Sequence, residues 1–486
     1  MTVSKSLQDI YERLVSILPP LVDVTDELDV STDIISEEDR ASLIESCACL
    51  IADYVTQNPL VMSKPEYSSI IKTSVLGLIE ETMFPCVSLI SEEELDLVYQ
   101  IASYVVFTTI IPRRSYRKTF VRKHKTPETA IDSKLQDIKD RPQSEQCTPQ
   151  WYIDRWNRLS GSNAWKAFGS QAQINSLILE KCKPVEAEKF QSVNTESSLH
   201  HGKRFEPVST QYYEYAYGAK VGEFGCIPHK EHSFLGASPD GIVVNKDCPR
   251  YGRMLEIKNV TTRKINGIPK EDYWIQMQIQ MEVCDLNECD FLETEIYTYP
   301  SHSEFEADGT FQKSSNGKYK GVITQYQVDG KPYYEYAPFQ CTQEEFDRWE
   351  EEICKQHANH TWISNIYYRI DTISCVLVLR NKAWMKAATD VLRDVWAQVL
   401  YDRENGYEHR KPKTKSATGK NRESVNSTNQ QTKCVINVMK LQYDNDDSGN
   451  NEDGITTELQ SIPKKRKTHD KSEQPSLYVD IGSDDV

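Results

Sequence analysis

Two acidic residues and a lysine in the middle of the chain have the types and spacing of a metal-dependent hydrolytic site. Asp240 lies in the sequence Ser-Pro-Asp-Gly, and Glu256 and Lys258 stand two residues apart inside an apolar run. Two carboxylates that converge near a strand edge are ligands that a hard cation such as Mg²⁺ prefers. A lysine beside them can orient a water molecule or stabilise charge that develops on a phosphate.

These side chains need two strands to bring them together. Successive side chains of a strand point to opposite faces, so Glu256 and Lys258 are predicted to share an exposed face while Leu255 and Ile257 point into the core. Asp240 comes within reach if its segment pairs with 254–260 as a hairpin. A plainer interpretation also fits, because Pro-Asp-Gly is a common turn and Glu-x-Lys alternation is a frequent solvated strand face.

Two further stretches carry residues suited to the same chemistry. The stretch 155–164 places a cation and hydroxyls just before a predicted helix that continues through residue 168, where they form a phosphate cradle or the serine is an ordinary cap. Glu206 falls near the start of a helix predicted over 201–217, as a third carboxylate or as a residue that favours the helix dipole.

A glutamine-rich helix is predicted after the lysine, over 273–281. A glutamine on this helix can hold a water molecule or a phosphate oxygen, but amphipathic helices often carry several glutamines without a function.

Composition bounds the class of protein. The 486-residue chain has 38% hydrophobic residues and a formal net charge of -16, so any contact with nucleic acid must come from local basic clusters. The 13 cysteines form no Cys-x-x-Cys motif, and the amino terminus lacks the apolar core of a signal peptide, which predicts a reducing intracellular compartment. The apolar run 97–112 is too short for a membrane span and is predicted to be a buried helix.

The chain divides into four segments. Residues 1–112 are predicted to form a helical accessory domain, with Ser36 and Ser91 as helix caps. Residues 113–150 are a basic and polar linker, whose first part, 113–125, either binds a phosphate backbone or is solvated. Residues 151–405 are the main domain. The tail 406–486 has the composition of a disordered segment, with a basic cluster at 464–467 of the nuclear-import kind.

Further strands are predicted in the main domain after the glutamine helix, over 291–299, 319–326 and 332–336. The segment 342–405 is predicted to be mostly helical, with a strand at 373–379. Its four tryptophans are interpreted as core residues: Trp349, Trp362, Trp384 and Trp396.

Taken in order, these motifs resemble the lambda exonuclease (YqaJ) branch of the PD-(D/E)xK nucleases, which includes the alkaline nucleases of large DNA viruses. The resemblance covers about residues 150 to 400. It implies an α/β fold, with a mixed central β-sheet flanked by helices as in restriction endonucleases. It does not cover the first part of the chain or the tail.

The resemblance also implies roles for the acidic residues. Asp240, Glu256 and the main-chain carbonyl of Ile257 would hold Mg²⁺ or Mn²⁺, as two ions. Lys258 would activate or position the attacking water, and Glu206 would be an additional acidic residue near the metals. The Cys and His residues have no set that favours zinc.

For the DNA end, the resemblance implies that Arg155 and Ser162 hold the terminal 5′ phosphate. Gln276 would support the water or the catalytic lysine. The choices between Arg155 and Arg158, and between Gln276 and Gln278, stay open.

This sequence departs from the family pattern in two places. Gly161 stands where the family often has alanine, a change expected to be harmless. The insertion 245–253 lengthens the hairpin and is expected to change how DNA reaches the site.

The function that the resemblance implies is a metal-dependent DNA exonuclease, acting 5′→3′ on duplex ends in recombination, repair or viral genome processing. A structure-dependent endonuclease, an RNA-degrading shutoff factor and a non-catalytic DNA-binding protein are the alternatives. The expected partners are double-stranded DNA ends and a single-strand annealing protein, with no membrane, and the chain can be an oligomer. The cluster 464–467 predicts the nucleus of a virus-infected eukaryotic cell.

Overall fold

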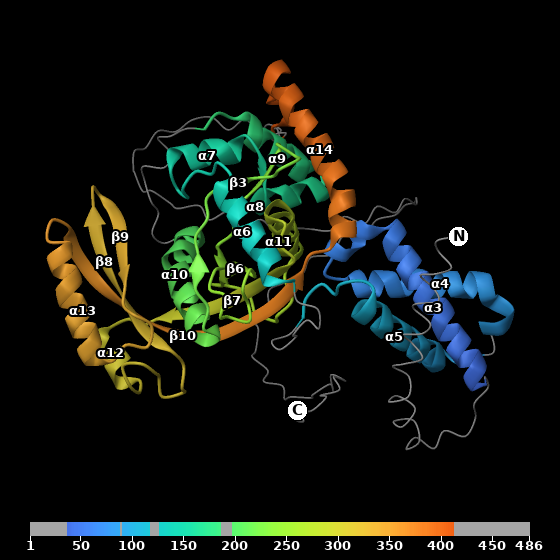
Figure 1. The fold of residues 1–486 in the computed structure, drawn as a ribbon, viewed down its shortest axis with the longest axis horizontal. Coiled ribbons are helices and arrows are strands. Elements are labelled where there is room, and N and C mark those ends of the chain that lie inside the picture. The colour runs from blue at the N-terminus through green and yellow to red at the C-terminus, as the bar shows by residue number, and fades with distance from the viewer. Residues whose placement is uncertain (1–35, 88–89, 117–125, 186–196, 413–486) are drawn as a thin grey trace, which may run out of the picture. The chain divides into compact units, whose positions relative to one another are not determined.

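The computed structural model describes residues 36–87, 90–116, 126–185 and 197–412 (Figure 1). The predicted disordered tail beyond 412, with its basic cluster, and most of the basic stretch 113–125 lie outside these residues. The cysteines that the structure describes are free thiols.

Helices form most of the described residues between 37 and 109, within the segment predicted to be helical. The cap interactions are those expected, because Ser36 Oγ accepts a hydrogen bond from the Asp39 amide at 3.1 Å and Ser91 Oγ accepts one from the Glu94 amide at 3.2 Å. The long helices of this part are α3 (Glu37–Gln57), α4 (Tyr67–Val87) and α5 (Glu92–Thr109), with the short η1 (Pro59–Ser63).

A seven-stranded mixed sheet forms the centre of the molecule, in the order β2-β5-β6-β7-β10-β8-β9. The β6–β7 pair is parallel and the other pairs are antiparallel. The predicted α/β class with a mixed sheet is therefore confirmed. The strands are β2 (Val221–Gly222), β5 (Gly241–Val243), β6 (Met254–Asn259), β7 (Glu288–Thr298), β8 (Lys320–Val328), β9 (Lys331–Tyr336) and β10 (Thr361–Leu379).

A second sheet of three short strands holds the loop that leads into the site. Its order is β1-β4-β3, and β1 runs parallel to β4. These strands are β1 (Leu159–Ser160), β3 (Ile227–Pro228) and β4 (Leu235–Ala237).

Helices lie on the sheet and connect its strands. Helix α11 (Glu271–Cys284) is the crossover that the parallel β6–β7 pair requires, and α10 (Ser198–Tyr217) packs against β6 (Figure 1). Trp274 of α11 and Trp384 of α14 meet edge to face, with ring centroids 5.2 Å apart, in the core. The remaining helices of this part are α7 (Pro149–Trp156), α8 (Gly161–Ala164), η2 (Trp165–Phe168), α9 (Gln171–Cys182) and α14 (Lys382–Asn405).

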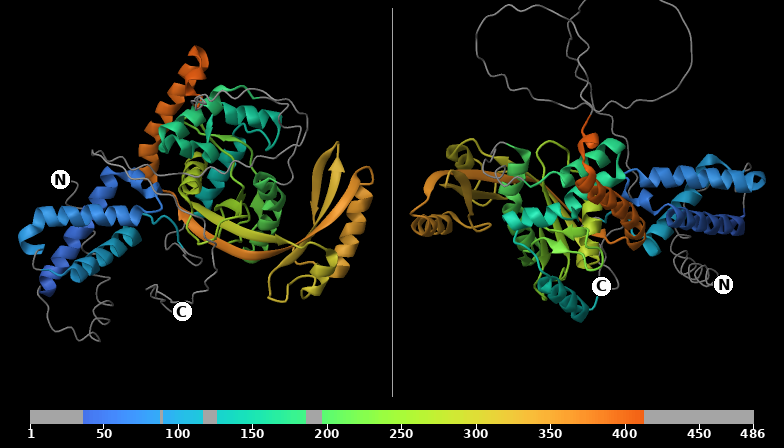
Figure 2. Two further views of the ribbon diagram at one scale, coloured as in Figure 1. Left: turned by 180° about the vertical axis from the view of Figure 1, so that it is seen from behind. Right: turned by 90° about the horizontal axis from the view of Figure 1, so that it is seen from above.

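The long strand β10 joins the central strands to an outer group of elements (Figure 2). Residues 368–379 pair with β7 and residues 361–369 pair with β8, and register shifts interrupt both ladders. The outer group contains β8, β9, α12 (His302–Ala307) and α13 (Gln343–Gln356). The predicted strand at 373–379 is therefore only the last part of a much longer one.

Three predictions about this region differ from the structure. Trp362 is 52% exposed rather than a core residue, because it lies near the open end of β10. The segment predicted as a polar linker contains α6 (Glu128–Asp140), since Leu135 and Ile138 bury one helical face. Arg114 of the basic stretch is buried and donates to the carbonyl of Pro269 at 2.6 Å, so it is a packing residue.

Candidate active site

The predicted hairpin exists and brings the acidic residues together. Strands β5 and β6 are antiparallel, and the amide of Ile257 donates to Asp240 Oδ2 at 2.7 Å. Leu255 and Ile257 point into an apolar cluster, as expected. Glu256 is completely buried, in contrast to the exposed face that was predicted, because helix α11 covers this side of β6.

The lysine lies directly on the buried carboxylate. Lys258 Nζ forms an ion pair with Glu256 Oε1. Burial alone would lower the pKa of Lys258, but the charges of Glu256 and Asp240 outweigh it and raise that pKa. Lys258 is therefore a cation at any neutral pH, able to orient a water or to stabilise a negative charge.

Glu206 joins the same electrostatic cluster from helix α10. Burial is the main reason why the pKa of Glu206 is raised; the charge of Lys258 acts to lower this pKa, and the charge of Glu256 acts to raise it. Burial, Glu256 and Glu206 together raise the pKa of Asp240 well above its usual range. Three carboxylates thus share one site with Lys258, and Lys203 also acts on Glu206, so negative charge is left to be neutralised.

A network at the end of β6 fixes the position of α10. Ser209 Oγ donates to Asn259 Oδ1 at 2.7 Å and lies 2.9 Å from Thr294 Oγ1. Asn259 Nδ2 donates to the carbonyl of Gly202 at 2.9 Å. These bonds hold the turn of α10 that carries Glu206 beside the strand that carries Lys258.

The donor set fits a hard divalent cation. No three Asp, Glu, His or Cys side chains within the described ranges can hold a metal ion on their own, so main-chain oxygen and water would have to complete the shell. Asp240 and Glu256 supply carboxylate oxygen. Gln280 Oε1 is buried without a hydrogen-bond partner among the described residues, and a metal-bound water is the kind of donor that would satisfy it.

The glutamine that reaches the site is not one of those considered from the sequence. Gln280 Nε2 donates to Glu256 Oε2 at 2.8 Å. Gln278 points away, donating to the carbonyl of Leu379 at 3.0 Å and accepting from the amide of Asn381 at 2.7 Å. The sequence held a signal for Gln280 only in the run of three alternating glutamines.

Gln276 lies next to the start of α8. A Cβ atom added to Gly161 would stand 3.0 Å from the carbonyl oxygen and 3.1 Å from Cγ of Gln276. The absence of a side chain at Gly161 therefore lets the two helices approach closely, so alanine there requires a small shift and is not free of cost. The proposed role of Gln276 toward Lys258 stays a prediction.

Arg155 and Ser162 form a second cluster. Arg155 Nη2 donates to Ser162 Oγ at 2.5 Å, and its guanidinium lies 4.3 Å from the centroid of the Trp151 ring. Arg158, two residues beyond the end of α7, instead pairs with Asp154 of that helix at 3.7 Å. The geometry thus brings together the pair that was predicted, Arg155 and Ser162.

Trp151 connects the two clusters. Its Nε1 donates to Ser238 Oγ at 3.1 Å, and Ser238 stands two residues before Asp240. The same tryptophan ring supports Arg155. The hydroxyl and guanidinium pair and the carboxylate site are therefore linked through one side chain.

A further cation borders the carboxylates. Arg263 forms an ion pair with the buried Glu293, the β7 partner of Lys258 in the parallel ladder. The Tyr273 ring lies between the two cations, 5.2 Å from Lys258 Nζ and 5.6 Å from the Arg263 guanidinium. Sequence analysis did not single out Arg263, because a lone arginine in a loop gives no signal.

The insertion 245–253 is fastened to the sheet. Arg250 forms an ion pair with the buried Asp290 of β7, and Arg253 pairs with Glu288 at 2.9 Å. The guanidinium of Arg250 also lies 3.4 Å from the centroid of the Tyr217 ring. The insertion is thus a packed part of the fold; its effect on DNA access stays a prediction.

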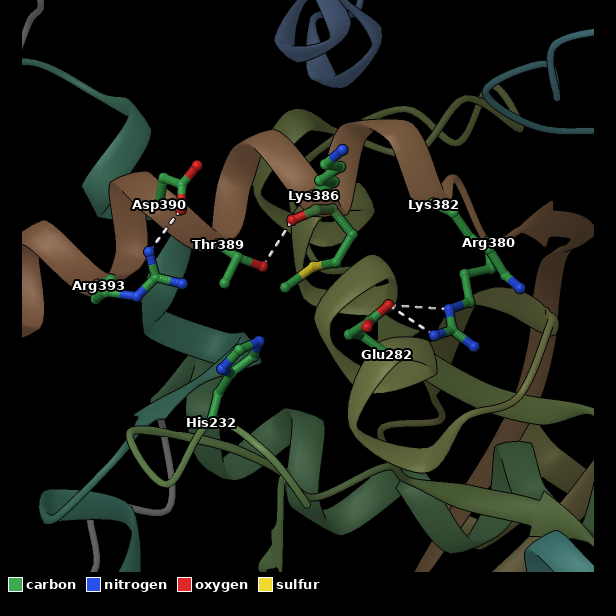
Figure 3. Close-up of a pocket in the computed structure, with 9 residues that line it drawn as sticks. His232, Glu282, Arg380, Lys382, Lys386, Thr389, Asp390 and Arg393 are labelled. Atoms are coloured by element: carbon green, nitrogen blue, oxygen red, sulfur yellow. Dashed lines mark hydrogen bonds and ion pairs between the residues drawn. The ribbon is translucent and has the colours of Figure 1, made fainter.

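A separate cationic pocket of about 380 Å³ lies between α11 and α14 (Figure 3). Two of its arginines are already paired with acidic residues, Arg380 with Glu282 at 2.8 Å and Arg393 with Asp390 at 2.6 Å. None of the predicted catalytic residues lines it. This pocket is therefore distinct from the carboxylate site.

Comparison with known proteins gives a family for part of the chain. Residues 150–287, which hold every predicted site residue, match the model of the YqaJ-like viral recombinase domain. The resemblance drawn from the ordered motifs is thereby confirmed.

Two other likenesses were found. An uncharacterised protein of Acanthamoeba polyphaga mimivirus is 29% identical over 315 residues, and the match spans 56% of this chain and 56% of that protein. The chain thus spans little more than half the length of this relative. The crystal structures of an alkaline exonuclease, LHK-Exo, from Laribacter hongkongensis and of LHK-Exo with dAMP are 17% identical, cover 53% of this chain and 95% of theirs, and give TM-scores of 0.30 and 0.31.

Proposed function

We propose that this chain, whose residues 150–287 match the model of the YqaJ-like viral recombinase domain, is a metal-dependent exonuclease that degrades DNA from duplex ends in the 5′→3′ direction. One observation carries the proposal. The carboxylate site of Asp240, Glu256 and Lys258 and the Arg155–Ser162 pair are joined through Trp151.

The carboxylates would hold one or two Mg²⁺ or Mn²⁺ ions, with the carbonyl of Ile257 as a further ligand. When bound, such ions supply a water of lowered pKa and relieve charge on the scissile phosphate. Lys258 orients the attacking water or stabilises the charge that develops on the phosphate. Gln280 orients Glu256 through its 2.8 Å hydrogen bond, and Glu206 adds negative charge that favours the cation.

The Arg155–Ser162 pair supplies the end recognition. A planar guanidinium beside a hydroxyl suits the oxygens of a terminal phosphate, and a 5′ phosphate held there would place a nearby phosphodiester at the carboxylates. Sequence along the DNA is not read by these groups, because they address only backbone charge.

We further propose a setting and a division of the chain. The enzyme would process DNA ends in recombination, repair or viral genome processing, in the nucleus of a virus-infected cell. It would work with an annealing protein and can form an oligomer. These proposals rest on the family resemblance and, for the nucleus, on the cluster 464–467. Residues 1–112, 113–150, 151–405 and 406–486 would be the accessory, linking, nuclease and tail segments. The part of the chain that the structure describes has no helix able to cross a membrane.

A cleavage assay with purified protein, 5′-phosphorylated linear duplex and Mg²⁺ or Mn²⁺ tests the proposal. The enzyme should release mononucleotides from linear duplex and leave circular DNA and RNA intact, and the Lys258→Ala variant should release none. Lys355→Ala is the matched control, because Lys355 forms an exposed pair with Glu351 at 3.1 Å on α13. Cleavage of circles would indicate an endonuclease, cleavage of RNA a shutoff factor, and binding without cleavage a DNA-binding protein.

A further inference from the structure

Two basic residues on other helices donate hydrogen bonds to the end of α7, next to the Arg155–Ser162 pair. Lys181 of α9 is 3% exposed, and its Nζ donates to the main-chain carbonyl of Arg155 at 2.6 Å. Arg403 of α14 donates through Nη2 to the carbonyl of Trp156 at 2.8 Å and to that of Lys181 at 2.8 Å. Residues far apart in the sequence thus converge on the last turn of α7.

The last turn of a helix is a poor place for an anion. Its carbonyl groups point outward with a negative partial charge, and they need donors from elsewhere. Arg155 and Trp156 are the final two residues of α7. The Lys181 amine and the Arg403 guanidinium donate hydrogen bonds to these carbonyls, which offsets their negative partial charge where a phosphate would bind.

The neighbour of Lys181 fixes the other half of the pair. Glu180 Oε1 accepts from Asn163 Nδ2 at 2.9 Å, and Asn163 Oδ1 accepts from the amide of Ser160 at 3.2 Å. Ser162 lies between Ser160 and Asn163 in the sequence. Consecutive residues of α9 therefore hold both the end of α7 and the start of α8, and so set the spacing between Arg155 and Ser162.

We propose that Lys181 and Arg403 are positioning residues that give the enzyme its preference for 5′-phosphorylated ends. They do so by satisfying the carbonyls at the end of α7 with hydrogen bonds and by holding Arg155 against Ser162. This inference rests on the proposed function, because it assigns the source of selectivity to the same site. Neither residue needs to touch DNA.

The surroundings of Lys181 disfavour its protonated form. Burial is the largest cause of a pKa of about 7 for Lys181; Glu180 and Cys226 act to raise this pKa, and Arg155 and Arg403 act to lower it. A phosphate beside Arg155 would add negative charge and favour the protonated lysine. Phosphate binding and the charge of Lys181 should therefore support each other.

The test compares kinetics on duplexes with a 5′ phosphate and with a 5′ hydroxyl. In Lys181→Met, the ratio of kcat/KM between the two ends should fall by about tenfold, mainly through a higher KM for the phosphorylated end. The Arg155→Ala variant shows how far this ratio falls when the guanidinium is removed completely. Lys320→Met is the matched control, because Lys320 is also buried and donates to main-chain carbonyls, of Phe305 at 2.5 Å and Asp308 at 2.7 Å, in the outer group of elements.

A second variant covers a failure of Lys181→Met to fold. Arg403→Lys keeps the charge but loses the planar guanidinium, whose Nε and Nη2 donate together to the carbonyls of Lys181 and Trp156, and it should lower the same ratio while Lys320→Met leaves it unchanged. A ratio that stays at the wild-type value in either folded variant, when Arg155→Ala lowers it, overturns the inference and leaves the nuclease assignment standing. A wild-type enzyme that cleaves without preferring a 5′ phosphate also overturns it, whereas no cleavage of linear DNA at all overturns the proposed function itself.

Discussion

Asp240 and Ile257 are joined across the β5–β6 hairpin by a hydrogen bond of 2.7 Å from the Ile257 amide to Asp240 Oδ2. One oxygen of the carboxylate is thereby fixed by the strand that carries Glu256 and Lys258. The bond sets the direction of the other oxygen and the distance between the two segments. This main-chain donor therefore holds Asp240 beside Glu256 and Lys258.

Replacing this carboxylate by an amide tests its role as a ligand. Asp240→Asn keeps an oxygen that can accept from the Ile257 amide but removes the negative charge. We expect cleavage to fall by about 10²-fold or more, with the unfolding temperature little changed. The measurement is nucleotide release in Mg²⁺ and Mn²⁺, and Asp132→Asn on α6 is the control. Full activity of Asp240→Asn would exclude it from the metal site.

The glutamines of α11 should separate into a functional and a structural one. Gln280→Leu should reduce turnover while the protein stays folded, because Glu256 loses a partner in the site. Gln278→Leu should instead lower the free energy of unfolding by about 1–3 kcal/mol, because it leaves the Leu379 carbonyl and the Asn381 amide unpaired. Chemical denaturation measures the free energy of unfolding, and nucleotide release from linear duplex measures turnover. The reverse pattern would show that Gln278 serves the chemistry.

Trp151 should couple the two clusters. Trp151→Phe keeps an aromatic ring under Arg155 but removes the indole donor to Ser238. We expect kcat/KM on 5′-phosphorylated duplex to fall by about five- to tenfold, the cost of one hydrogen bond that fixes geometry. Trp362→Phe, at an exposed position of β10, is the control. An unchanged kcat/KM would mean that the two clusters are positioned independently.

The lowered pKa of Lys181 predicts how the free energy of unfolding depends on pH. Its pKa is about 7 in the folded protein against an ordinary value of 10.5, so between these pH values the unfolded chain holds a proton that the folded chain has lost. Stability should therefore rise with pH across this window, by at most about 1.4 kcal/mol per pH unit, and the penalty of the buried charge is complete below pH 7.

The Lys181→Met variant lacks this contribution. The difference in free energy of unfolding between wild type and variant should shift in favour of wild type as the pH is raised from 6.5 toward 9. Urea denaturation at several pH values measures it. A difference that is constant with pH would show that Lys181 keeps an ordinary pKa.

The local parts of the fold could be predicted from the sequence. The caps at Ser36 and Ser91 and the Asp240–Glu256 hairpin depend on residues near one another in the chain, and the structure has all of them. The pairing of Arg155 with Ser162 was also predicted, because the order of the motifs resembles a known family. These features need no knowledge of distant packing.

The remaining features depend on how distant elements pack. Residues two apart on a helix point about 200° from each other, so the rotation of α11 decides whether Gln278 or Gln280 faces Glu256. That rotation is set by the core around Trp274 and Trp384. Lys181 and Arg403 look like solvated charges in the sequence, and only the fold carries them to the end of α7.

The direction and starting point of degradation test the central claim most directly. A linear duplex with a 5′ phosphate is labelled at its 5′ end in one sample and at its 3′ end in another, and release of label is followed with time in Mg²⁺. The account predicts that the 5′ label is released at once as a mononucleotide and that the 3′ label is released only late. Immediate release of the 3′ label, or release of long fragments from either sample, would contradict it.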